Sequence, residues 1–124
     1  MIGDNERPEF WVGHIRMETD KLEESESFMT TLGMRPIFKN DKLAIVELRA
    51  ATHLLLVAKE DIEPGDASFD LMVDDLEVTH RRLIEAGLSP SDIVEGRIHN
   101  SFKINDPSGH AITVNSSHAS GKAV

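Results

Sequence analysis

Cysteine is absent from the 124-residue chain, so neither a disulfide nor a thiolate metal site can form. No apolar run approaches the roughly 18–20 residues that a membrane-spanning helix needs. The polar segment 1–9 also lacks the apolar core of a secretory signal. These absences argue against a membrane protein, and we expect a cytoplasmic location.

Basic residues are scarce: 13 Lys and Arg stand against 22 Asp and Glu, a net charge of −9. Phosphate backbones are bound by clustered Lys and Arg, so the sequence argues against a nucleic-acid partner. The acidity is interpreted as a source of solubility. Neither a serine-hydrolase elbow nor a phosphate-binding P-loop is present.

The first half of the chain predicts a strand, a helix and three further strands. Asp20 is expected at the helix N-cap with Glu23 three residues later, and Gly33 provides the stop. Asn40 and Asp41 favour a hairpin turn. The expected strands are 10–18, 35–39, 43–49 and 53–59, and the expected helix is 21–32.

The second half repeats this order after a charged linker at 60–66. We expect strands at 67–73, 92–98, 101–105 and 110–115, a helix at 75–86, and a loose polar tail at 118–124. The length suits a single domain, 1–124, made of two units at 10–59 and 67–117.

An internal repeat supports this division. A shift of 54 residues superposes five identical residues at positions with structural meaning, namely a cap, an apolar stripe, a capping partner and a helix stop. The alternative is two unrelated strand–helix pairs that share capping chemistry. The matched pairs are Asp20 and Asp74, Leu22 and Leu76, Glu23 and Glu77, Gly33 and Gly87, and Pro36 and Pro90.

Several phrases in this order resemble the vicinal oxygen chelate superfamily, which includes glyoxalases, bleomycin-resistance proteins and extradiol dioxygenases. The resemblance spans residues 10–117. It implies an α+β fold in which two tandem βαβββ modules form one curved sheet with a concave cleft. It also implies a homodimer. The phrases are His14-Ile15, Val73-Asp74-Asp75-Leu76-Glu77, Ala86-Gly87 and Asp106-Pro107-Ser108-Gly109-His110.

The same resemblance implies where a metal would bind, because metal-dependent members draw ligands from the first and last strand of each module. His14 is a good ligand, but the other positions hold Leu56 (or Leu55 by a one-residue slip), Ser68 and Thr113. Zinc, iron and nickel sites want three or more imidazole or carboxylate ligands. We therefore expect no cofactor, and a divalent metal is disfavoured.

Strand alternation predicts which residues face the cleft. The candidate ligand-binding residues are His14, Arg16, Ser68, Asp70, Met72 and Thr113, and His14 is the candidate catalytic residue. Arg16 and Asp70 allow three interpretations: a structural ion pair or simple solvation, anion recognition by Arg16, or acid–base chemistry by His14 oriented by Asp70 or Glu18. Phe10 and Trp11 are expected to pack in the core or in a dimer interface.

The leading hypothesis is a metal-independent protein that binds a small molecule in the cleft, in the manner of bleomycin-resistance proteins. The alternative is a lyase, isomerase or dioxygenase in which His14 acts with a metal or as an acid or base. A structural or regulatory dimer is a third class, because one fold hosts many functions.

Overall fold

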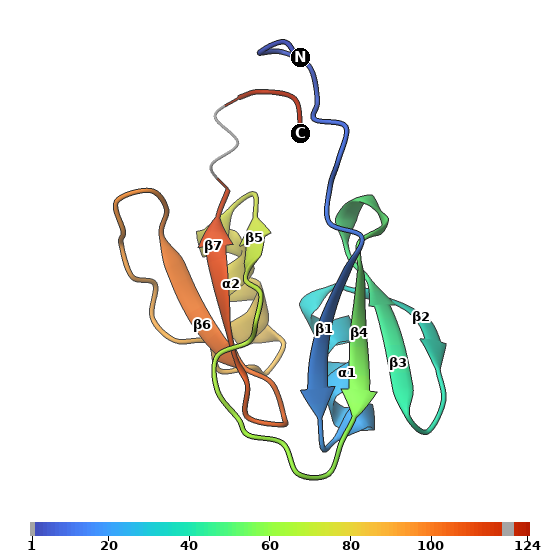
Figure 1. Cartoon of the computed structure of the whole chain (residues 1–124). Helices are drawn as coiled ribbons and strands as arrows, with labels where there is room; N and C mark the ends of the chain where they lie inside the picture. Colours follow the sequence, from blue (N-terminus) through green and yellow to red (C-terminus); the bar gives the residue numbers. More distant parts are fainter. Residues whose placement is uncertain (1, 118–120) are drawn as a thin grey trace.

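The computed structural model describes residues 2–117 and 121–124 and is shown in Figure 1. Two α-helices and seven strands are found in these residues. In chain order the elements are β1 (His14–Thr19), α1 (Leu22–Leu32), β2 (Arg35–Lys39), β3 (Leu43–Glu47), the 3₁₀ turn η1 (Arg49–Ala51), β4 (His53–Ala58), β5 (Leu71–Val73), α2 (Leu76–Glu85), β6 (Ser101–Asn105) and β7 (Ala111–Ser116).

The strands form two mixed sheets, with the orders β1-β4-β3-β2 and β5-β7-β6, where the resemblance implied one curved sheet. In each sheet the first strand pairs in parallel with the last strand of its unit, and the remaining pairs are antiparallel. Both helices lie behind the sheets in Figure 1, so each sheet has one covered and one open face. No helix in the described part of the chain is long and apolar enough to cross a membrane.

The internal repeat is visible in the registers of the two sheets. His14 lies opposite His53, and the 54-residue shift carries His14 to Ser68. In the second sheet Leu71 lies opposite Val114, as Met17 lies opposite Leu56 in the first, whereas Ala111 pairs with Asp66 and not with Ser68. β3 and β4 therefore correspond to β6 and β7 at a shift of 58 residues, because the path from Gly87 to β6 is four residues longer than the path from Gly33 to β3.

The core lies between the sheets and their helices, as alternation along the strands predicts. Met17 is 5% exposed while its neighbours His14 and Arg16 are exposed, and Ile15 is half-buried on the helix side. The same alternation continues in the other central strands, where the helix-facing residues are Ala44, Val46, Leu54, Leu56, Phe102, Ile104, Ile112 and Val114.

Both helices begin one residue later than the sequence suggested, and the capping prediction was wrong. Asp75 caps α2 by accepting a hydrogen bond from the Val78 amide at 3.1 Å. Lys21 is the N-cap of α1 and makes no side-chain cap bond. The predicted stops are confirmed, because Gly33 and Gly87 have φ of 120° and 87°, which glycine adopts without strain.

Three strand predictions also need correction. The segment 10–13 precedes β1, and β5 contains only Leu71–Val73 of the predicted 67–73, with a single bridge at Asp66 before it. The predicted strand 92–98 reduces to one bridge between Val94 and Ser101. Within the predicted tail, residues 118–120 lie outside the described residues and residues 121–124 contain neither helix nor strand.

A buried hydrogen-bond network joins the two units. The Asp106 carboxylate, 4% exposed, accepts hydrogen bonds from Ser25 in α1 at 2.8 Å and from Ser108 at 2.6 Å. It also accepts one from the His110 amide at 3.0 Å, which fixes the β6–β7 turn. The His110 ring in turn lies 2.7 Å from the Glu18 carbonyl at the end of β1.

Two arginines link the units at the opposite end. Arg82 of α2 donates to the carbonyls of Thr31 and Leu32, at 3.3 and 2.7 Å. It thereby satisfies the C-terminal carbonyls of α1, which lacks a basic residue in its own last turn. Arg49 of η1 pairs with Asp74 at 2.9 Å.

The network around Asp106 predicts a large loss of stability on truncation. Asp106→Ala removes the carboxylate that accepts from the hydroxyl of Ser25, a residue 0% exposed, and leaves that hydroxyl only Thr19 Oγ1 at 2.7 Å. We expect a loss of about 3 kcal/mol in the free energy of unfolding, measured by urea titration. Asp61→Ala, in the exposed linker, is the matched control and should stay within roughly 0.5 kcal/mol of the parent. Equal effects of the two changes would contradict a joining role for Asp106.

Candidate functional site

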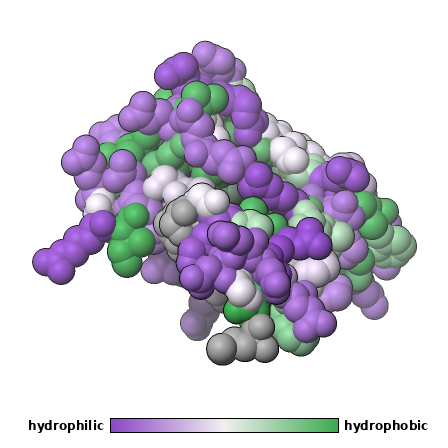
Figure 2. All heavy atoms as spheres, turned by 90° about the horizontal axis from the view of Figure 1, so that it is seen from above, coloured by the Kyte–Doolittle hydropathy of each residue, from purple (hydrophilic) through white to green (hydrophobic). Residues whose placement is uncertain are grey.

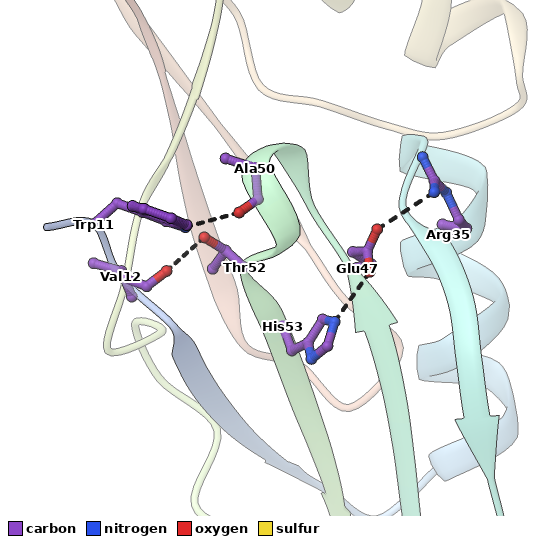
Figure 3. Close-up of polar contacts among 7 residues, drawn as sticks. All are labelled: Trp11, Val12, Arg35, Glu47, Ala50, Thr52 and His53. Carbon is purple, nitrogen blue, oxygen red and sulfur yellow. Dashed lines mark hydrogen bonds and ion pairs between the residues drawn. The ribbon is translucent and has the colours of Figure 1, made fainter. Parts of the chain in front are cut away.

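A row of polar side chains crosses the open face of the first sheet (Figure 3). Glu47 of β3 contacts Arg35 of β2 at 3.4 Å on one side and the His53 Nε2 of β4 at 3.1 Å on the other. His14 of β1 lies opposite His53, and their ring centroids are 5.8 Å apart. The pairing register thus aligns two imidazoles, a carboxylate and a guanidinium across four strands.

The segment before β1, residues 7–13, forms an arm that lies against the β3–β4 turn (Figure 3). The Trp11 indole N–H donates to the Ala50 carbonyl at 2.7 Å, and the Thr52 hydroxyl donates to the Val12 carbonyl at 2.6 Å. Of the two expectations for Trp11, packing in the core is wrong, because its side chain lies at the surface and is 65% exposed, and packing in a dimer interface stays a prediction.

The turn that receives the arm has an unusual backbone. Ala50 and Ala51 have φ of 58° and 63°, in the left-handed region where a Cβ costs roughly 1–2 kcal/mol per residue. Residues held in this way cluster at sites where the surrounding structure needs the conformation. Here the conformation presents the Ala50 carbonyl to Trp11.

A hollow of about 490 Å³ lies on the open face of the second sheet. Asn115 of β7 is 3% exposed and its Nδ2 donates to the Asp70 carboxylate at 2.7 Å. Because a carboxylate only accepts, this contact fixes the orientation of the Asn115 amide. The polar residues lining the hollow are Asp66, Ser68, Asp70, His99, Ser101, Thr113 and Asn115.

The predicted site residues therefore fall in different places. Ser68, Asp70 and Thr113 share the second-sheet hollow, whereas His14 lines a hollow at the arm. Met72 lines a third hollow, at the junction of the two units. The backbone carbonyl of Arg16 lies 3.5 Å from the Ser68 hydroxyl, so Arg16 is at the boundary between the units.

The proposed Arg16–Asp70 ion pair is not formed. No such contact occurs among the ion pairs of the described residues, and Asp70 binds Asn115 instead. Asn115 was missed because its partnership with Asp70 depends on the register between β5 and β7. The signal in the sequence that could have pointed to Asn115 was the polar pair Asn115-Ser116 at the end of a mostly apolar strand.

The structure also decides between the two leucines at the metal-ligand position of the first unit. Leu56 is 0% exposed on the helix side, whereas Leu55 shares the open face with His53. Leu55 corresponds to Thr113 at the 58-residue shift. No group of three or more His, Asp or Glu side chains able to hold a metal occurs within residues 2–117 and 121–124.

His53 and Glu47 are further residues that the sequence pattern did not single out. They lie six positions apart, and only the β3–β4 hairpin brings their side chains together. The available signal was a polar residue at the end of β3 and another at the start of β4. Such a signal does not specify that the two side chains contact each other.

The comparisons with known proteins agree with this architecture. The model of the Glyoxalase/Bleomycin resistance protein/Dioxygenase superfamily matches residues 11–114, so the chain belongs to that superfamily. No curated protein sequence matches the chain.

Solved structures of low sequence identity share the fold. Lactoylglutathione lyase from Agrobacterium tumefaciens superposes with a TM-score of 0.77 at 18% identity, covering 93% of this chain and 99% of that one. A bleomycin-binding protein in complex with bleomycin gives 0.67 at 15% identity, covering 87% and 98%. The oxidase ChaP-H2 gives 0.67 at 17% identity, covering 89% and 95%. The predicted α+β fold is confirmed.

The left-handed turn leads to a prediction about stability. Ala50→Gly should raise the free energy of unfolding by roughly 0.5–1 kcal/mol, because the relief of strain exceeds the extra backbone entropy of glycine. Ala58→Gly at the end of β4 is the control and should lower stability by roughly 0.5–1 kcal/mol. Thermal and urea unfolding would measure both changes. A destabilised Ala50→Gly would show that the turn carries no strain.

Proposed function

We propose that this protein binds a small, polar molecule in the second-sheet hollow and that binding requires no metal. The observation that carries the proposal is the Asp70–Asn115 pair. A nearly buried amide holds a carboxylate at the wall of an open hollow of about 490 Å³. Concave sites with a few well-placed polar groups are the usual form of a small-molecule site.

The donors and acceptors of the hollow suggest the kind of molecule. Asn115 occupies one carboxylate oxygen of Asp70, Oδ2, and the other oxygen has no partner among the hydrogen bonds of the described residues. The hydroxyls of Ser68 and Thr113 can donate or accept. A ligand rich in hydrogen-bond donors, such as an amine or a polyhydroxylated compound, fits this set. The bleomycin-binding relative is a precedent for ligand binding on this fold.

Metal independence is supported by the residues at the ligand positions. Leu55, Ser68 and Thr113 accompany His14, and neutral hydroxyls are poor ligands for zinc or iron. His14 lies beside His53, but Glu47 occupies the Nε2 of His53.

A lyase, isomerase or dioxygenase that uses His14 is the second candidate, and the polar row of the first sheet favours it. Glu47 orients His53, and a carboxylate–imidazole pair of this kind supports acid–base chemistry. Turnover of lactoylglutathione, lost in His14→Ala, would support the enzyme over the binding protein.

A homodimer and a cytoplasmic location complete the proposal. The homodimer is proposed because many members of the superfamily form homodimers. The cytoplasmic location is proposed because the sequence contains no cysteine.

Ligand binding in the hollow can be mapped by NMR. A set of fragment-sized amines and polyols should shift the backbone amide signals of Ser68, Asp70 and Thr113. Asp70→Asn should weaken the bound amines at least about tenfold, because hydrogen bonds to a charged acceptor contribute roughly 1.5–3 kcal/mol. Asp92→Asn, on an exposed loop, is the control. Shifts confined to the outer surfaces of the helices would contradict the proposal.

The metal content is a separate prediction. Elemental analysis of the purified protein should find far less than one Zn, Fe, Mn or Ni per chain, and the fragment shifts should persist in excess EDTA. About one metal per chain, lost in His14→Ala, would overturn metal independence.

A further inference from the structure

Two large aromatic side chains of the arm are exposed although the arm is anchored. Phe10 is 86% exposed and Trp11 is 65% exposed. The arm is nevertheless held at three points: the indole N–H on Ala50, the Val12 carbonyl on Thr52, and the Gly13 carbonyl on the His53 amide at 2.9 Å. Figure 2 views this end of the molecule, where hydrophobic residues reach a largely hydrophilic surface. Apolar side chains that are fixed yet exposed indicate a binding surface.

An open hollow of about 410 Å³ lies beside the anchored arm. It is lined by Phe10 and Trp11 of the arm, by Ala51 of the strained turn, and by His14 and His53 of β1 and β4. A second, mainly apolar hollow of about 490 Å³ adjoins it across the same two aromatic side chains. The space therefore suits a flat ligand of one or two fused rings.

Glu47 determines which hydrogen bond His53 can offer to such a ligand. The Nε2 of His53 lies 3.1 Å from a Glu47 carboxylate oxygen, which can only accept, so this nitrogen carries a hydrogen. In the neutral ring Nδ1 is then an acceptor. Arg35 holds Glu47 from the other side at 3.4 Å, so the orientation is fixed along the row.

We propose that the arm, the β3–β4 turn and the two imidazoles form a second binding site, which takes a flat aromatic ligand carrying a hydrogen-bond donor. The ring packs against Trp11 and Phe10, and the donor binds the Nδ1 of His53. None of the residues lining this hollow lines the hollow at Asp70. The site is therefore separate from the hollow at Asp70, although it shares His14 and His53 with the enzyme considered as the second candidate.

Benzimidazole and 1-methylbenzimidazole form a matched pair of probes, since methylation removes the N–H donor and keeps the ring. The chain has a single tryptophan, so its one indole N–H signal in an ¹⁵N NMR spectrum reports the site directly. Benzimidazole should shift this signal in a saturable way. The methylated probe should shift it with an affinity lower by about tenfold, the loss of one good hydrogen bond.

His53→Phe keeps an aromatic ring but removes the acceptor. It should reduce the affinity for benzimidazole to that for the methylated probe, and it should leave the affinity for the methylated probe unchanged. The effects of the two changes would then be non-additive, as expected when the N–H of the probe contacts His53 directly. His80→Phe on α2 is the control and should change neither affinity. Trp11→Ala is a second variant at an exposed position, read from the His14 and Ala51 amides, and it should weaken both probes equally.

Three results would overturn the site. The indole signal could fail to move with either probe. The two probes could bind equally well and be insensitive to His53→Phe. Finally, the signal could shift with protein concentration in the absence of any probe, in which case a second copy of the chain covers the arm.

Discussion

The buried carboxylate of Asp106 is the constraint on which the arrangement of the two units depends. It fixes the β6–β7 turn through Ser108 and the His110 amide, and it reaches across to Ser25 in α1. A buried charge is tolerated only when several donors compensate it, so the turn and the helix must meet in one geometry. That geometry also brings His110 to the end of β1, and the open faces of the two sheets are placed accordingly.

In both units, the residues that fill the core lie on one face of the sheet and the residues that could bind a ligand lie on the other. Equivalent helix-facing residues are apolar in both units, whereas equivalent open-face residues differ: His14 corresponds to Ser68, Arg16 to Asp70, and Leu55 to Thr113. The covered face must fill a core, but the open face is free of that requirement. The first unit consequently carries imidazoles at its sheet end, and the second carries hydroxyls, an amide and a carboxylate around its hollow.

Local patterns predicted the features that local physics determines. The glycine stops, the Asn40 turn and the apolar, helix-facing side of the central strands follow from backbone conformation and alternation, and all are present. The helix start of the second unit was misplaced by one residue because Asp74 and Asp75 are adjacent and both can cap. The pairs Glu47–His53 and Asp70–Asn115 could not be predicted, because strand register creates them. The exposed arm could not be predicted either, since Trp11 finds its partner 39 residues away.

The β3–β4 turn connects features that the sheets alone would leave separate. Its Ala50 carbonyl holds Trp11, and its Arg49 pairs with Asp74, immediately before the cap of α2. Both contacts originate from adjacent residues of one strained segment, so a change in the turn alters the arm and the second unit together. Strain of roughly 1–2 kcal/mol per residue is comparable with the hydrogen bond and ion pair that the turn makes. The net free energy that holds the arm against the turn is therefore small. A ligand that contacts Trp11 changes this free energy directly.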